Sequence, residues 1–130
     1  IEENATNSTD TANSTDTNQQ ESVKGEFIQI NSSELNSNLS KLPANTKVVL
    51  FFDASWCPTC QFLERNLEAT RENIPDGVII YKIDYDSNQG LRDTYGVKVQ
   101  HTLVQIDLSG NTLKKWAGSP DLNSILAELQ

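Results

Sequence analysis

Residues 47–60 read KVVLFFDASWCPTC and place two cysteines where an apolar segment ends. The first part, KVVLFF, is β-branched and aromatic without alternation, which is typical of a strand buried on both faces. Apolar side chains then recur at helical spacing from Cys60 to Ile74. The stretch therefore predicts a buried strand that passes directly into a helix, with Cys57 at the start of that helix.

The remaining segments continue an alternation of strands and helices. We expect strands over residues 26–30, 47–52, 78–83, 101–108 and 112–117. We expect helices over residues 31–42, 57–74 and 88–95, and a last helix that Pro120 and Asp121 start. Ser33 is the expected N-cap of the first helix. The strand over 101–108 alternates, which predicts one shared face for Thr102, Val104, Ile106 and Leu108.

This order predicts the fold class. Buried strands joined by helices favour parallel pairing with right-handed crossovers. The Ser-Gly-Asn turn at 109–111 joins the last two strands as an antiparallel hairpin. The chain is therefore expected to be an α/β protein, with a central mixed sheet that has a parallel core and helices on both faces.

Residues 1–22 differ in composition from the rest of the chain. Fourteen of these 22 residues are Asn, Ser, Thr or Gln, and five are acidic. Such a segment cannot bury enough surface to offset its ordering entropy. We therefore expect a disordered tether over 1–22 and one domain over 23–130. Ile1 is not a translation start, which indicates a removed export or lipid-anchor leader, or a cloning boundary.

Charge and composition exclude several functions. The formal net charge is −8, and residues 23–130 carry 10 basic against 13 acidic groups. A basic surface for nucleic acid is therefore not expected. No apolar run approaches the ~20 residues of a membrane span, so any membrane attachment would use a removed N-terminal anchor. Two cysteines and one histidine are too few for a disulfide framework or a four-ligand structural zinc site within one chain.

The Cys-x-x-Cys pair carries the chemistry. Unpaired N–H groups and the dipole at a helix N-terminus stabilise a thiolate, so Cys57 is the candidate nucleophile. Cys60 lies one turn on and faces the core, as a resolving thiol would. Pro58 fits the first turn because it loses no hydrogen bond there. We favour a redox role for this pair. The alternatives are that the two cysteines form half of a metal site or are inert and buried.

At this point the chain resembles the thioredoxin superfamily over about residues 24–130. The resemblance centres on Phe52-x-Ala54-x-Trp56-Cys57-Pro58-Thr59-Cys60 and is supported by Lys82–Asp86, Tyr95-Gly96-Val97, Thr102-Leu103-Val104 and Asp107–Asn111. It implies a thioredoxin fold and thiol–disulfide exchange through a mixed disulfide, in which Cys57 attacks and Cys60 resolves. It implies no cofactor, a monomer, protein thiols or disulfides as substrates, and a partner protein that exchanges electrons.

The resemblance also assigns the neighbours of the pair. It implies that Trp56 shapes the rim beside Cys57 and that Pro58 and Thr59 help to set the reduction potential. Cytosolic thioredoxins usually have Gly-Pro between the cysteines, and the Pro-Thr pair here is more similar to exported branches of the family. With the tether, this leads us to expect an extracytoplasmic protein held through its N-terminal segment.

Two positions depart from the family. His101, preceded by Gln100, stands where the family has a cis-proline, next to backbone that docks substrates. A cis bond before a non-proline residue costs about 3–4 kcal/mol, so we expect a trans Gln100–His101 bond and an altered loop. Phe51 stands where the family often buries an acid. For Asp53, two residues later, we favour the interpretation of an exposed charge at the end of the strand. The alternative is that Asp53 substitutes for the buried acid of the family.

The sequence is compatible with three roles for His101. As an imidazolium it would stabilise the Cys57 thiolate, and as a neutral ring it would shuttle a proton between thiols. With Cys57 and Cys60 it would form a set of three metal ligands. The hypotheses are therefore a thiol–disulfide oxidoreductase first, a metal- or iron–sulfur-binding protein second, and a redox-inert binding module third.

Overall fold

The computed structural model describes residues 22–130, so the predicted tether lies outside the described residues except for Ser22. The strands are β1 (Glu26–Ile30), β2 (Lys47–Asp53), β3 (Val78–Asp84), β4 (Thr102–Ile106) and β5 (Thr112–Ala117). The helices are α1 (Ser32–Leu39), α2 (Pro58–Ala69), the 3₁₀ turn η2 (Arg71–Asn73), α3 (Gln89–Tyr95) and α4 (Leu122–Glu128). The predicted alternation of strands and helices is confirmed.

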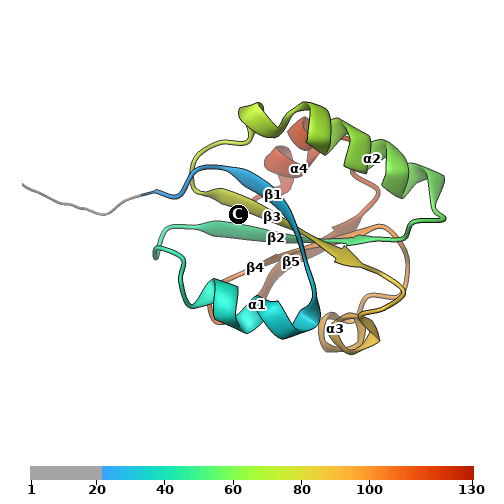
Figure 1. Ribbon diagram of the computed structural model, residues 1–130, viewed down its shortest axis with the longest axis horizontal. Helices are drawn as coiled ribbons and strands as arrows, with labels where there is room; N and C mark the ends of the chain where they lie inside the picture. Colours follow the sequence, from blue (N-terminus) through green and yellow to red (C-terminus); the bar gives the residue numbers. More distant parts are fainter. Residues whose placement is uncertain (1–21) are drawn as a thin grey trace, which may run out of the picture.

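The five strands form one mixed sheet in the order β1-β3-β2-β4-β5. β3 pairs in parallel with both β1 and β2, while β4 is antiparallel to β2 and to β5. Helices α2 and α4 cover one face of the sheet and α1 and α3 cover the other (Figure 1). The predicted fold class, with a parallel core and a C-terminal antiparallel hairpin, is confirmed.

β2 is the centre of the core because both of its faces are covered. Val49 and Phe51 point to the side of α2 and α4, and Val48, Leu50 and Phe52 point to the other side. All five of these side chains are fully buried. The sequence of β2 does not alternate because both faces of the strand are buried, as predicted. This burial also fixes the position in which the strand ends, below the cysteines.

β4 is shorter than the strand expected over 101–108, but the predicted shared face is confirmed for Val104, Ile106 and Leu108, which pack into the core on the side of α1 and α3. All five of its residues are buried, including Gln105, whose Oε1 accepts the N–H of Gln130 at 2.8 Å. The reason is that β4 pairs with strands on both sides and lies between the two helical layers. Polar residues in this strand are therefore buried and hydrogen-bonded, so the alternation does not distinguish a core face from a solvent face.

The ends of the first two helices also differ from expectation. Asn31, and not Ser33, caps α1: its Oδ1 accepts the Ser33 N–H at 3.0 Å, while the Asn31 N–H donates to Glu34 at 2.9 Å. This is a reciprocal capping box. α2 ends at Ala69, where the Thr70 hydroxyl donates to the Asn66 carbonyl at 2.7 Å. The helical spacing of apolar residues extends to Ile74 because the 3₁₀ turn η2 follows α2 directly.

The helices in the described part of the chain are short, and the longest, α2, has 12 residues. None of the helices within residues 22–130 is long and apolar enough to cross a membrane.

Gly25 is the position in the fold with the least room for a side chain. A Cβ there would lie 2.1 Å from the Ile74 carbonyl oxygen and 2.5 Å from that of Pro75. Both are backbone atoms, so no side-chain rotation relieves the clash. We expect Gly25→Ala to lower the free energy of unfolding by about 1–3 kcal/mol, measured by urea denaturation at 25 °C.

Gly90→Ala is the matched control, because no atom beyond its chain neighbours and the adjacent helix backbone lies within 4 Å of a Cβ at this position in α3. The added methyl group should raise stability by up to about 1 kcal/mol through helix propensity. An equal loss of stability in the two variants would contradict the close approach at Gly25.

Candidate active site

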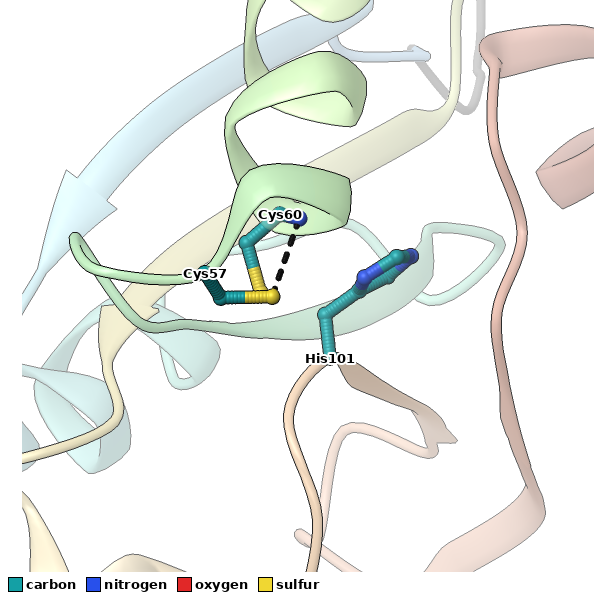
Figure 2. A group of neighbouring side chains, drawn as sticks. All are labelled: Cys57, Cys60 and His101. Carbon is teal, nitrogen blue, oxygen red and sulfur yellow. Dashed lines mark hydrogen bonds between the residues drawn. The ribbon is translucent and has the colours of Figure 1, made fainter.

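The end of β2 and the start of α2 together place Cys57. After β2 the chain turns, and the Cys57 N–H donates to the Ala54 carbonyl at 3.1 Å. Cys57 is the N-cap of α2, with Pro58 in the first turn of the helix, and its Sγ accepts the Cys60 N–H at 3.3 Å (Figure 2). The sulfur thus satisfies one of the free N–H groups at the helix N-terminus, as expected from the sequence.

The two thiols have different acidities. Burial disfavours the Cys57 thiolate, but hydrogen bonds from Cys60 and Thr59 outweigh this effect and hold its pKa below the ordinary value. The Thr59 hydroxyl lies 3.1 Å from the Cys57 sulfur. Burial, followed by the hydrogen bond to Cys57, raises the pKa of Cys60 to about 12. The arrangement gives one reactive thiol at the surface end of the helix and one protected thiol below it.

His101 lies beside both sulfur atoms. Its ring nitrogen and the two sulfurs all lie within 4.8 Å of one another, and all three residues are buried. Figure 2 shows the imidazole next to the sulfurs, with one nitrogen on their side and the other pointing away. Nε2 lies 2.9 Å from the Ser119 carbonyl and donates to it, whereas the buried Nδ1 has no hydrogen-bond partner within residues 22–130.

The peptide bond between Gln100 and His101 is cis, so the predicted trans bond is wrong. That prediction considered only the intrinsic preference of the bond. In the folded chain, tertiary contacts hold His101 on several sides: its carbonyl accepts the Gly118 N–H at 3.3 Å and its ring bonds to Ser119. The ring also lies edge-on to Phe51, with centroids 5.7 Å apart. Gln100 is half-buried next to it.

Asp53 is buried, so its interpretation as an exposed strand-end charge is wrong. Side chains two residues apart in a strand share a face, and Asp53 therefore lies on the α2 side with Phe51. Its Oδ2 is 3.9 Å from the Lys82 ammonium, which also pairs with Glu64 at 2.5 Å. Its Oδ1 is buried and has no partner in the described residues. Burial and the nearby Glu64 charge raise the pKa of Asp53 to about 6, although Lys82 opposes them.

Trp56 lies on the surface, directly before Cys57 in the chain. Its side chain is 55% exposed, its indole N–H donates to Asp86 at 2.8 Å, and its ring lies edge-on to Tyr85. Two contacts therefore hold the indole in place while the residue remains largely exposed. Its role in forming the rim beside Cys57 stays a prediction.

Three residues around the site were not identified from the sequence. Lys82 interrupts the otherwise apolar VIIYKI strand, and such a residue signals a buried ion pair. Glu64 lies four residues after Cys60 on the same side of α2, and this spacing could have pointed to it. Ser119 contributes a backbone carbonyl, which has no sequence signal.

The buried Asp53 carboxylate makes stability depend on pH. Its folded pKa of about 6 is above the ordinary value of 3.8, so the charged form costs stability as the pH rises from about 4 through 6. We expect Asp53→Asn to raise the free energy of unfolding at pH 8 by about 1–3 kcal/mol. The gain should shrink toward pH 4, where the wild-type carboxyl is neutral, as measured by urea denaturation across this range.

Asp93→Asn, on the exposed side of α3, is the control for the loss of one negative charge. It should leave the pH profile of stability close to that of the wild type. A gain in Asp53→Asn that is the same at pH 4 and pH 8 would contradict a buried carboxylate with a raised pKa.

The chain is similar in sequence to known proteins. The Thioredoxin family model matches residues 26–130. Thioredoxin H4 of Arabidopsis thaliana is 29% identical over 76 residues, which cover 58% of this chain and 63% of the relative. Thioredoxin-T of Drosophila melanogaster is 31% identical over 71 residues, which cover 55% and 45%. The chain thus spans less than two thirds of the length of either of these curated relatives.

A solved structure extends the likeness to three dimensions. A mutant thioredoxin from Halobacterium salinarum superposes with a TM-score of 0.60 at 31% identity, covering 79% of this chain and 84% of that one. The family match spans every strand and helix of the described domain. With a cysteine pair at the start of α2 and a mixed sheet between two helical layers, this chain belongs to the thioredoxin family.

Proposed function

We propose that the domain is an extracytoplasmic thiol–disulfide oxidoreductase that exchanges electrons with protein thiols and disulfides. The observation that carries this proposal is the asymmetry of the cysteine pair. Cys57 caps the helix with its sulfur and has a lowered pKa, whereas Cys60 is completely buried and has a raised pKa. An attacking thiol needs the first environment and a resolving thiol tolerates the second.

The exchange follows from these positions. The Cys57 thiolate attacks one sulfur of a substrate disulfide, and the other substrate sulfur leaves with the electron pair of the broken bond. Cys60 then attacks the Cys57 sulfur, which forms the Cys57–Cys60 disulfide and releases the second substrate sulfur. The two protons of the dithiol end on the two product thiols. A redox partner protein restores the dithiol, and the reverse sequence oxidises a substrate.

The first test traps the mixed disulfide. Cys60→Ser leaves the attacking thiol but removes the resolving one, so we expect covalent adducts on a non-reducing gel that disappear with dithiothreitol. Cys57→Ser is the matched control, and it should form few adducts because Cys60 is buried. Equal trapping by both variants, or none by Cys60→Ser, would rule out the assigned roles.

The extracytoplasmic setting has separate support. Residues 1–22 are rich in Asn, Ser, Thr and Gln and have five acidic and no basic residues, a composition suited to a solvated spacer. Pro58-Thr59 lies between the cysteines, and this pair is similar to that of exported branches of the family. Such a protein would meet thiols and disulfides outside the cytoplasm, where disulfides persist.

This setting is tested on intact source cells that express the full-length gene. After mild reduction, a membrane-impermeant maleimide should label Cys57 of the intact cells as completely as that of lysed cells. A thiol protein of the cytoplasm, probed in the same samples, should be labelled only after lysis. Labelling of Cys57 only after lysis would place the domain inside the cell.

A further inference from the structure

We propose that the dithiol form of the domain binds one Zn²⁺ ion per chain through Cys57 Sγ, Cys60 Sγ and His101 Nδ1, with the fourth position open to an external ligand. This goes beyond thiol–disulfide exchange, because it gives the same cysteines a second chemistry. It uses the cysteine pair and does not depend on the proposed redox activity or its direction.

The donor set and its spacing fit zinc. Thiolate sulfur and imidazole nitrogen are its usual protein ligands, at about 2.3 and 2.0–2.1 Å. In a tetrahedron these lengths place ligating atoms about 3.5–3.8 Å apart. The three donor atoms already lie within 4.8 Å of one another, so shifts on the order of 1 Å would close the site.

The orientation of His101 is the second, independent observation. A histidine that binds a metal commonly donates its other ring N–H to a carbonyl, which fixes the tautomer and aims the free nitrogen at the ion. Here Nε2 donates to the Ser119 carbonyl at 2.9 Å. In the neutral ring Nδ1 then carries a lone pair, and it is buried without a hydrogen-bond partner in residues 22–130. The hydrogen bond from Nε2 to the Ser119 carbonyl, which a metal-binding imidazole would need, is thus already present.

Charge and burial also match a zinc ion. Two thiolates, a neutral imidazole and Zn²⁺ sum to zero charge, so the occupied site carries no net charge into the interior. Cys57, Cys60 and His101 are 4%, 0% and 3% exposed, so little water competes with these side chains for the ion. Binding converts both thiols to thiolates and releases their two protons to solvent.

Zinc and the disulfide exclude each other, because the Cys57–Cys60 bond consumes both sulfur ligands. A zinc-loaded domain would hold its dithiol reduced and shielded from substrates until the ion is removed. Zinc occupancy would therefore act as a reversible block on exchange, set by the concentration of free Zn²⁺.

The test titrates reduced, metal-free protein with Zn²⁺ in competition with a chromophoric chelator. We expect one Zn²⁺ per chain for the dithiol and none for the disulfide form. His101→Gln should weaken binding at least tenfold. Val99→Ala is the matched control, since this exposed residue lies in the same loop two positions earlier; it should leave zinc affinity unchanged.

A second measurement on the wild-type protein covers the case in which His101→Gln does not fold. His101 is the only histidine of the chain, so its ring nitrogens are assigned without ambiguity by ¹⁵N NMR. On addition of Zn²⁺, Nδ1 should move to a metal-bound shift while Nε2 keeps its proton. No change at Nδ1, unaltered affinity in folded His101→Gln, one ion per two chains, or equal binding by the disulfide form would each overturn the proposal.

The redox proposal is judged separately from the metal site. Trapping by Cys60→Ser is carried out with a chelator present, so it reports exchange without metal. Zinc titration needs no turnover. A negative trapping experiment would therefore leave the zinc site standing, and a negative zinc titration would leave the redox activity standing.

Discussion

The site depends on one hydrogen bond, from the Cys60 N–H to the Cys57 sulfur at 3.3 Å. In most helices an oxygen of Ser, Thr, Asp or Asn accepts this bond, and here a sulfur does so. The bond fixes the direction of the attacking thiol and the start of α2 at the same time. Because β2 is buried on both faces, its end is held in place, and the helix begins at a defined height above the sheet. The same geometry buries Cys60, which raises its pKa, and places the hydrogen bonds that lower the pKa of Cys57.

The residue at position 101 changes what the cysteine pair can contact. A proline there would present only carbon atoms, whereas His101 presents a nitrogen lone pair to the two sulfurs. The ring is oriented by the Ser119 carbonyl and packs against Phe51, so it is part of the core and not a mobile surface group. Phe51 itself leaves no acid directly below the cysteines, and Asp53 supplies a carboxyl on the same face two residues later.

The fold and the cysteine pair were predictable from the sequence because both rest on local patterns. An apolar strand, a helical repeat and a Cys-x-x-Cys at their junction are all contained in residues 47–74. The errors arose where distant parts of the chain meet. The cis bond before His101 lies in a loop held by residues 118 and 119, and the burial of Asp53 depends on α2 packing above it. The alternation in β4 predicted the shared face of Val104 and Ile106, but it gave no sign that the opposite face of this strand is buried as well.

The anchor of His101 comes late in the chain. Cys57 and Cys60 are near the middle, whereas Ser119, which orients the imidazole, follows them by about 60 residues. At about 5–20 residues per second, a ribosome needs on the order of 3–12 s to add that length. During this interval the nascent chain carries a dithiol whose histidine is at first absent and then not yet oriented by the Ser119 carbonyl. The segment from His101 to Ser119 therefore completes the site in time as well as in space.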